Sequence, residues 1–368
     1  MIGLSTAREL HMRGVRRTTV IDRGRVGGEA SWAAAGMLAP NAECDSADEF
    51  HRFCVESAAM YPAVAEDLKD ETGIDIELDR SGTLYLAFTE EDSHELSERY
   101  AWQNTAGMNV RRLSAEETLS LEPSVSRDVR EALSFPDDWQ VENRRLIEAL
   151  RKYCVDHGIE LLEEIEVGEL LVENGKVAGV DSSAGRLFAG NTILAAGAWT
   201  SLVNVNGIAI PFQVKPIRGQ MLCYKAESIR LRHVIYSSNG YLVPRADGRI
   251  LAGSTVEDVG FQKDVTDAGI AQLRSVAAEI APSLTAVIPI DKWAGLRPFV
   301  PPDGLPMIGW QPGVENLFIA TGHYRNGILL APITAKIVAE AIADAKYSEY
   351  LNQFSPERFL GARYTVGT

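Results

Sequence analysis

The chain opens with residues 1–24, MIGLSTARELHMRGVRRTTVIDRG, and this stretch carries the clearest signal of its architecture. The spacing of apolar residues predicts an amphipathic helix from the second or third residue, and Gly14 separates it from a short buried strand that ends at Asp22. A helix followed by a strand, with an acidic residue about twenty positions after the first turn, forms the second half of a dinucleotide-binding βαβ unit. The opening stretch therefore predicts an α/β fold with a nucleotide site.

Composition narrows the class of protein. The 368 residues are 46% hydrophobic and 24% charged, which is ordinary for a soluble globular protein and allows two domains, or one large domain with insertions. The formal net charge of −15 argues against nucleic acid and anionic membranes as partners. The four cysteines lack CxxC spacing and the six histidines include no HExxH, so we expect reduced thiols and no metal site. No apolar run reaches membrane-spanning length and no signal pattern is seen, which predicts a cytoplasmic protein.

Helical and strand patterns alternate along the rest of the chain. Residues 74–89 alternate in polarity around Ser81-Gly82 and predict a β-hairpin. The other expected elements are one or two helices over 46–72, helices over 90–107, 143–158, 267–281 and 327–344, and strands over 159–199 and 213–256. Helices and buried strands interrupted by two β-rich insertions predict a nucleotide-binding core with a second, antiparallel domain threaded into it.

Three stretches are suited to lining a bound nucleotide. Gly3 occupies the place of the last glycine of a GxGxxG loop, and Asp22 is placed to accept hydrogen bonds from an adenosine ribose. The small residues of GRVGGEASWAAAGMLAP (24–40) let backbone N–H groups approach a pyrophosphate. The strand in NTILAAGAWT (191–200) ends where a nucleotide would lie. Ordinary structural roles, such as a tight loop leading into a small-residue helix, remain the alternative for each.

Five motifs in one order give the chain a family resemblance. They are GGEASWAAAGMLAP (27–40), TILAAGAWT (192–200), YLVPR (241–245), WAGLRP (293–298) and GHYRNGILLAP (322–332). With them the chain, from Met1 to about residue 345, resembles the glycine oxidases of the thiamine-biosynthesis type, within the D-amino-acid oxidase and sarcosine oxidase family of FAD enzymes. The first and last motifs are specific within that family, whereas the alanine-rich strand is shared by many FAD enzymes.

The resemblance implies a fold of two domains. An FAD-binding, Rossmann-like domain is assembled from separated segments, and a substrate domain built on an antiparallel sheet is inserted into it. In this chain the implied FAD domain covers 1–76, 137–212 and 295–350, the substrate domain covers 77–136 and 213–294, and a C-terminal tail covers 351–368. Some relatives attach FAD through a cysteine after the carboxylate-binding arginine. Because no cysteine follows Cys223, we expect FAD to be bound non-covalently.

The resemblance also implies a reaction. Glycine, and with it sarcosine or small D-amino acids, is oxidised by hydride transfer to flavin N5. The imine hydrolyses to glyoxylate and ammonia, or feeds the thiazole ring of thiamine, and O2 is reduced to hydrogen peroxide. The implied partners are therefore a small amino acid and O2, and relatives also tend to self-associate into homo-oligomers.

Arg297, Tyr241 and Arg325 are the expected catalytic residues. An arginine holds a carboxylate in a bidentate fork, and Arg297 matches the family's carboxylate arginine. Tyr241 would donate its hydroxyl to the same carboxylate or to a water, and Arg325 would reach substrate or flavin. The alternatives are a surface ion pair for Arg297 and a half-buried strand residue for Tyr241. His323 is expected to pack or orient rather than to act as a base.

The flavin contacts follow the same motifs. Residues 322–332 are expected to bring a helix N-terminus, at about Asn326-Gly327, to the N1–C2=O edge of the reduced flavin, with Pro332 near the helix start. The resemblance assigns the flavin contacts to Gly3, Asp22, Arg23, Ser31, Ala33, Gly36, Met37, Val167, Ala196, Gly197, Trp199, Gly322, Asn326, Gly327, Ile328 and Leu329.

One departure from the family concerns the start of the chain. Relatives begin with a hydrophobic strand and a glycine-rich loop directly before the residues that match Leu4–Ala7, and only MIG corresponds to it here. That strand is central in the family's sheet, so the expectation is a native protein that continues roughly ten to fifteen residues upstream. The 368-residue chain is accordingly expected to bind FAD weakly or not at all.

Three other functions stay open. A quinone-linked D-amino-acid dehydrogenase is a related enzyme, although the acidic chain has no basic or amphipathic membrane anchor. A truncated, flavin-free binding protein is supported only by the absent strand. A nicotinamide dehydrogenase is weaker, because nothing resembles a second nucleotide-binding half of that kind.

Overall fold

The structure, a computed structural model, describes residues 1–208 and 210–360. The helices are α1 (Ile2–Met12), α2 (Ala30–Ala33), α3 (Glu49–Thr72), α4 (Glu90–Thr105), α5 (Ala115–Leu121), α6 (Asn143–Asp156), α7 (Asp267–Ile280), α8 (Ala331–Ala343) and α9 (Leu351–Phe354), with 3-10 turns η1 (Gly197–Leu202), η2 (Pro282–Ala286) and η3 (Pro356–Phe359). The strands are β1 (Thr19–Ile21), β2 (Met37–Leu38), β3 (Thr83–Ala87), β4 (Arg111–Ser114), β5 (Glu131–Phe135), β6 (Trp139–Gln140), β7 (Glu160–Leu162), β8 (Val167–Glu173), β9 (Lys176–Ser182), β10 (Gly185–Phe188), β11 (Thr192–Leu194), β12 (Lys215–Lys225), β13 (Val234–Ser237), β14 (Gly240–Pro244), β15 (Arg249–Gly253), β16 (Asp291–Phe299), β17 (Met307–Trp310) and β18 (Leu317–Thr321).

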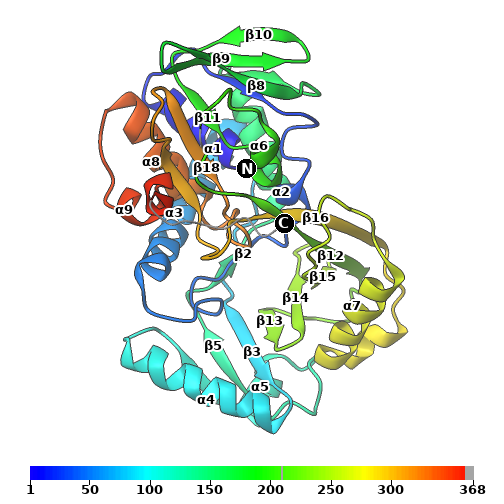
Figure 1. Ribbon diagram of the computed structural model, residues 1–368. Helices are drawn as coiled ribbons and strands as arrows, with labels where there is room; N and C mark the ends of the chain where they lie inside the picture. The colour runs from blue at the N-terminus through cyan, green and yellow to red at the C-terminus, as the bar shows by residue number, and fades with distance from the viewer. Residues whose placement is uncertain (209, 361–368) are drawn as a thin grey trace.

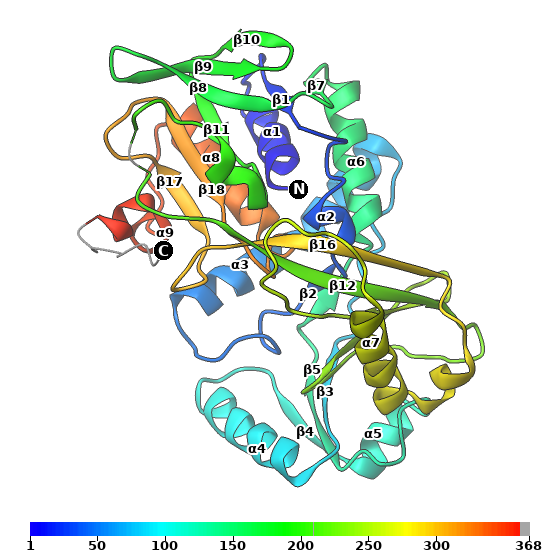
Figure 2. The same ribbon diagram turned by 45° about the vertical axis from the view of Figure 1, so that its right-hand side comes forward.

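The elements fall into two halves (Figure 1), one with α1, α6, α8 and the short parallel pairs, the other with the large sheet and α4, α5 and α7. The long strands β12 and β16 run between the halves, and α2 lies against β16 (Figure 2).

The helix–strand opening is confirmed, because α1 ends at Met12 and β1 ends at Ile21, directly before Asp22. The α/β architecture therefore agrees with the opening stretch of sequence.

Parallel pairing occurs in the first half in two separate places. β1 pairs in parallel with β7, and β11 pairs in parallel with β18, which continues antiparallel to β17. Among the described residues, β1 has no neighbour other than β7, and β11 has none other than β18. The strand expected ahead of Gly3 has no counterpart in this part of the chain.

The second half is an eight-stranded sheet in the order β16-β12-β15-β14-β13-β3-β5-β4. The sheet is antiparallel, as expected, except at one junction, where β13 and β3 pair in parallel with Val234 opposite Thr83. This pair joins the two sequence segments that build the half, β3–β5 and β12–β16. Because β3 and β13 are not joined by a hairpin, which would force antiparallel pairing, they can pair in parallel.

The β-hairpin expected over residues 74–89 is wrong. Only its second arm forms a strand, β3, whose neighbours are β5 and β13. The first arm turns away: Asp79 exchanges backbone hydrogen bonds with Gln140, at N–O distances of 2.8 and 3.0 Å. Long-range partners therefore outcompete the local turn at Ser81-Gly82, which the alternating pattern could not reveal.

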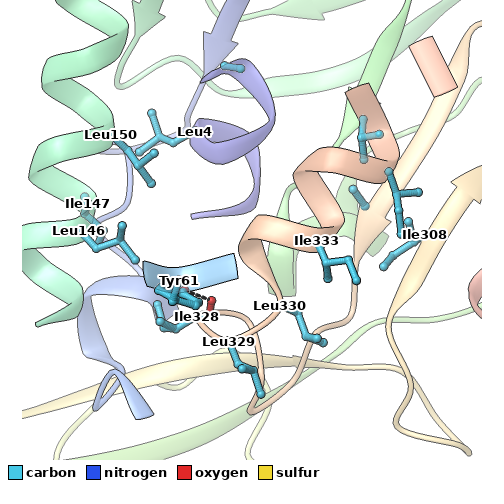
Figure 3. Packing of buried hydrophobic residues seen from close by; sticks show 14 of the residues in the cluster. Leu4, Tyr61, Leu146, Ile147, Leu150, Ile308, Ile328, Leu329, Leu330 and Ile333 are labelled. Carbon is cyan, nitrogen blue, oxygen red and sulfur yellow. Dashed lines mark hydrogen bonds between the residues drawn. The ribbon is translucent and has the colours of Figure 1, made fainter. Parts of the chain in front are cut away.

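The helix expected from Gly327 begins later, at Ala331, after a run of turns over residues 327–330. Pro332 has no N–H, so it cannot bond the carbonyl of Ile328 in the helical ladder. Helix α3 supplies donors instead: the Tyr61 hydroxyl donates to the Ile328 carbonyl at 2.5 Å, as Figure 3 shows, and the Ser57 hydroxyl donates to the Leu329 carbonyl at 2.6 Å. Side chains of α3 thus hold the segment in addition to its own backbone hydrogen bonds, such as that from the Leu330 N–H to the Asn326 carbonyl at 2.8 Å.

One hydrophobic core unites distant segments in the first half. Leu4 of α1, Leu146 and Leu150 of α6, and Ile333 of α8 belong to one buried cluster (Figure 3). Phe354 of α9 is fully buried in the same cluster, so the described beginning of the predicted C-terminal tail packs into this core. The remainder of that predicted tail, residues 361–368, lies outside the described residues. No helix in the described part of the chain is long and apolar enough to cross a membrane.

Candidate active site

One cavity of about 1200 Å³ extends from α1 and β1 to β12, β14 and β16. Arg297, Tyr241 and Arg325 line it, together with all the residues expected to contact flavin except Gly322 and Leu329. Leu329 points into the core instead and is 2% exposed. Gly322 has φ of +74°, and a Cβ there would lie 2.5 Å from Val300, so this glycine serves the turn that precedes the cavity wall.

The nucleotide end of the cavity is formed by α1 and the end of β1. Met1 to Leu4 line the cavity, so the first N–H groups of α1 and the positive end of its dipole lie at the wall. Asp22 accepts a hydrogen bond from the Gly24 N–H at 3.0 Å, and burial raises the pKa of its carboxyl. The Arg23 guanidinium lies 4.4 Å from the centre of the Trp199 ring. Anion-binding groups, a carboxylate and a stacking surface thus meet here.

The small residues of 27–40 also serve close packing. Helix α2 lies so near β16 that a Cβ at Gly295 would lie 2.6 Å from the Ala33 Cβ. The Trp293 indole N–H donates to the Ala33 carbonyl at 2.9 Å, and the Asn143 amide donates to the Ser31 carbonyl at 2.7 Å. The small residues of this stretch therefore do have a packing role, which was the alternative to nucleotide binding. Ser31, Ala33 and Gly36 nevertheless line the cavity.

At the opposite end, Arg297 lies on β16 where this strand pairs with β12. The register places Arg297 opposite Ile217, so its guanidinium crosses the neighbouring Gly219. Its Nη2 donates to Ser254 Oγ at 2.8 Å and its Nη1 donates to the Thr255 carbonyl at 3.2 Å. Among the described residues Arg297 has no acidic partner within salt-bridge distance, so the surface ion pair considered as the alternative is not what holds it. The guanidinium is oriented by neutral oxygens and keeps its charge for a ligand.

Tyr241, on β14, lines the same cavity as Arg297. The residue is 6% exposed, and its hydroxyl lies 3.5 Å from the Met221 sulfur. A Cβ at Gly253 would lie 2.5 Å from the Tyr241 ring, so this glycine leaves the room that the ring fills. A thioether is a weak acceptor, so the phenol remains able to donate to a stronger one in the cavity.

Sequence reasoning did not find the acidic group of this site. Glu43, in the loop after β2, accepts a hydrogen bond from Arg325 Nη2 at 2.9 Å and one from the Tyr236 hydroxyl at 2.5 Å, both on Oε1. Burial alone would raise the pKa of Glu43, but Arg325, the Tyr236 hydroxyl and the charge of Arg297 outweigh it and lower that pKa. Burial, with Glu43 next to it, raises the pKa of Tyr236 well above its ordinary value. Glu43 is therefore ionised and Tyr236 neutral.

Asp138 holds the loop that carries Glu43 through hydrogen bonds to Asn41 and Ala42. This fully buried carboxylate accepts hydrogen bonds from the Asn41 N–H at 3.1 Å, the Asn41 side-chain amide at 2.8 Å and the Ala42 N–H at 2.7 Å. Burial raises the pKa of Asp138 to about 7, against the effect of these donors. Nothing in the sequence around Glu43 or around Asp138 marks either acid, because their partners lie far away along the chain.

His323 behaves as a packing residue. It is 4% exposed, its Nε2 lies 3.0 Å from the Thr334 hydroxyl, and burial lowers the pKa of its imidazole to about 3. A neutral imidazole bonded to the first turns of α8 agrees with an orienting role. Among the described residues, no cluster of His, Cys, Asp and Glu is arranged to hold a metal ion.

The cavity suits a long dinucleotide cofactor. Its volume exceeds the roughly 300–1000 Å³ of ordinary ligand pockets. Its lining passes from a helix N-terminus and a ribose-type carboxylate to the Arg297 end, as a molecule with a nucleotide at one end and a reactive ring at the other requires. The residues present therefore fit FAD.

Comparison with known proteins identifies the family. Residues 1–341 match the family model described as "FAD dependent oxidoreductase". The chain belongs to the FAD-dependent oxidoreductase family. Within this family, the chain is 36% identical to a glycine oxidase of Pseudomonas aeruginosa over 93% of this chain and 92% of that protein. This FAD-dependent amino-acid oxidase is therefore of the glycine oxidase-like kind.

Two further members of the family extend the likeness. A bifunctional protein ThiO/ThiG of Synechocystis is 35% identical over 98% of this chain, which spans 53% of that longer protein. The crystal structure of glycine oxidase from Geobacillus kaustophilus superposes with a TM-score of 0.90, at 32% identity, over 97% of this chain and 96% of that one. The fold of an FAD-dependent oxidoreductase is thus shared over nearly the whole length.

Proposed function

We propose that this chain oxidises glycine, and also sarcosine or small D-amino acids, with non-covalently bound FAD. The observation that carries the proposal is the position of Arg297 and Tyr241 at one end of a cavity whose other end holds Asp22 and the α1 N-terminus. The likeness to glycine oxidases supports the choice of glycine. The net reaction takes glycine, O2 and water to glyoxylate, ammonia and hydrogen peroxide.

Arg297 binds and orients the substrate. Ser254 Oγ and the Thr255 carbonyl hold the guanidinium, so its bidentate fork receives the substrate carboxylate without first breaking an ion pair. The Tyr241 hydroxyl donates to the same carboxylate, because its present contact with sulfur is a weak one. With the carboxylate fixed, the substrate Cα is directed along the cavity toward Asn326 and Gly327, where the reactive ring is expected.

Among the described residues that line the cavity we identify no strong base for this arrangement, and the reaction needs none. Of the candidate groups, His323 is buried against Thr334, and Glu43 is engaged by Arg325 and Tyr236. A bound FAD would supply the acceptor for the hydride from the Cα of a substrate with a neutral amine, and a route for the electrons to O2. The protein then contributes orientation, exclusion of water and compensation of the substrate's negative charge.

The division into domains, the metabolic role, the cellular location and the self-association expected from the sequence belong to the same proposal. The FAD-binding domain is Rossmann-like and comprises 1–76, 137–212 and 295–350, with 77–136 and 213–294 forming the substrate domain. The shared core of α1, α6 and α8 supports this division. We also include delivery of the imine to thiazole formation for thiamine, a cytoplasmic location and self-association, as the family resemblance implies.

The deciding experiment is the visible spectrum of the purified 368-residue chain, before and after anaerobic glycine. The proposal requires a flavin spectrum that bleaches with glycine and regains its colour in air, with hydrogen peroxide formed. The variant Arg297→Met should keep the flavin colour but need far more glycine to bleach. Bleaching without oxygen consumption, but with electron transfer to a quinone dye, would instead indicate the dehydrogenase. A folded, colourless protein that takes up no added FAD would indicate the flavin-free alternative.

A further inference from the structure

The substrate end of the cavity holds a second guanidinium that the binding of one carboxylate does not use. Arg325, on the loop before α8, lines the cavity with Arg297 and Tyr241, and its side chain is 39% exposed. It forms a salt bridge with Glu43, with 2.9 Å between Arg325 Nη2 and Glu43 Oε1. Glu43 raises the pKa of Arg325 further above its ordinary value, so the pair is fully charged.

Glu43 is held firmly in this role. Both hydrogen bonds it accepts fall on the same oxygen, and one comes from Tyr236, which is 6% exposed and packs 5.6 Å, centre to centre, from the Tyr241 ring. The side chain of Glu43 is only 15% exposed. A carboxylate fixed in this way masks Arg325 permanently rather than as one of several surface rotamers.

The net charge of the side chains at this end of the cavity matches a ligand with a single carboxylate. Two guanidiniums, Arg297 and Arg325, and one carboxylate, Glu43, leave a single positive charge, which one substrate carboxylate neutralises. A ligand with two carboxylates would leave one negative charge unpaired beside Glu43, whose side chain is only 15% exposed, and such an unpaired charge is costly.

We propose that Glu43 is a specificity-determining residue that restricts the site to ligands with a single carboxylate by occupying Arg325. The inference rests on the proposed function in assigning Arg297 to the substrate carboxylate. Removal of the Glu43 charge converts Arg325 into a second carboxylate site, so the chain becomes able to bind dicarboxylates whose two acid groups lie on either side of a central atom.

The test uses two unreactive ligands that differ by one carboxylate, glycolate and diglycolate. Their dissociation constants are measured by calorimetry on the FAD-supplemented protein and on Glu43→Gln. Glutamine keeps the oxygen that accepts from Tyr236 and Arg325 and removes only the charge. We expect the preference for glycolate over diglycolate to fall by about tenfold or more in this variant. Glu43→Ala, measured in parallel, carries the same expectation.

Three controls separate the charge of Glu43 from other effects. Asp45→Asn removes a carboxylate two positions along, whose side chain is 95% exposed and pairs with Arg99, and should leave the preference unchanged. Glu43→Asp keeps the charge and should stay selective. In Glu43→Gln/Arg325→Met the gained affinity for diglycolate should be lost again, because its binding group is gone.

An unchanged preference in both Glu43→Gln and Glu43→Ala would overturn the proposal. So would an equal shift in Asp45→Asn, or a gain that survives Arg325→Met. Glycine oxidation by the wild-type chain, followed as peroxide formation, is measured separately. Its absence would count against the proposed function, while the ligand titrations would still decide the role of Glu43.

Discussion

The guanidinium of Arg297 occupies the space that a side chain at Gly219 would fill. A Cβ at residue 219 would lie 2.1 Å from Arg297 Nη2 and 2.3 Å from Nη1. The two residues belong to paired strands, β12 and β16, with Ile217 directly opposite Arg297. The absent side chain at 219 is therefore a condition for the position of the carboxylate-binding group.

Gly219→Ala should weaken substrate binding more than it weakens the fold. The atoms in conflict are the far end of a flexible side chain, so Arg297 is expected to move while the strands stay paired. We expect KM for glycine to rise by about tenfold or more, with overpacking costing about 1–3 kcal/mol of stability at most. Steady-state kinetics with urea unfolding measures both.

The matched change is Gly24→Ala, where an added Cβ meets no atom within 4 Å. This control should leave KM for glycine as in the wild type. If Gly219→Ala kept the wild-type KM, the position of Arg297 over Gly219 would have no bearing on substrate binding.

Asp22 offers a test of the nucleotide end. A carboxylate that accepts hydrogen bonds from ribose hydroxyls contributes about 1.5–3 kcal/mol, so Asp22→Ala should weaken FAD binding roughly tenfold to a hundredfold. Asp22→Asn retains an oxygen for the Gly24 N–H and should lose less. Quenching of flavin fluorescence during titration gives the dissociation constants. Equal FAD affinity in wild type and Asp22→Ala would exclude the assigned contact.

Local patterns predicted what local forces determine. The α1 helix and the β1 strand follow from apolar spacing and from the break at Gly14, and the structure has both. The hairpin at Ser81-Gly82 failed because β3 finds its partners in β5 and β13. Strand alternation reports which face is buried, but it does not identify the neighbouring strand.

The candidate site shows the same division. Arg297, Tyr241 and Arg325 were marked by their motifs, and all three line one cavity. Glu43 and Tyr236 were missed, because their hydrogen bond joins positions 193 residues apart and neither lies in a distinctive motif. The partner of a charged residue depends on strand register and loop packing, which a single sequence does not encode in any short pattern.

Tyr61 stabilises the turn that leads into α8. It is fully buried, and its hydroxyl donates to the carbonyl of Ile328, which cannot bond residue 332 because that residue is proline and which also accepts from the Ala331 N–H at 3.2 Å. Tyr61→Phe removes the donor and keeps the ring, so the carbonyl loses one of its two hydrogen bonds at a cost of about 0.5–1.5 kcal/mol. Tyr347→Phe, at a residue that is 65% exposed, should change stability by less than about 0.5 kcal/mol. Similar urea midpoints for the two variants would argue against this bond.

His323 should make stability depend on pH in a defined window. Burial lowers the pKa of its imidazole to about 3, whereas an unfolded histidine titrates near pH 6.5. Between these values the unfolded chain binds a proton that the folded chain does not. The free energy of unfolding therefore falls as pH decreases through this window, while above about 6.5 the residue contributes no slope.

Replacing the imidazole should remove that part of the slope. As pH falls below about 6.5, the wild type should lose stability relative to His323→Gln by up to about 1.4 kcal/mol per pH unit. Urea unfolding of both proteins at a series of pH values measures the difference. His94→Gln, whose ring is 78% exposed on α4, is the matched control and should follow the wild type. A constant difference between His323→Gln and wild type across this range would mean that the folded protein protonates His323 as readily as the unfolded chain does.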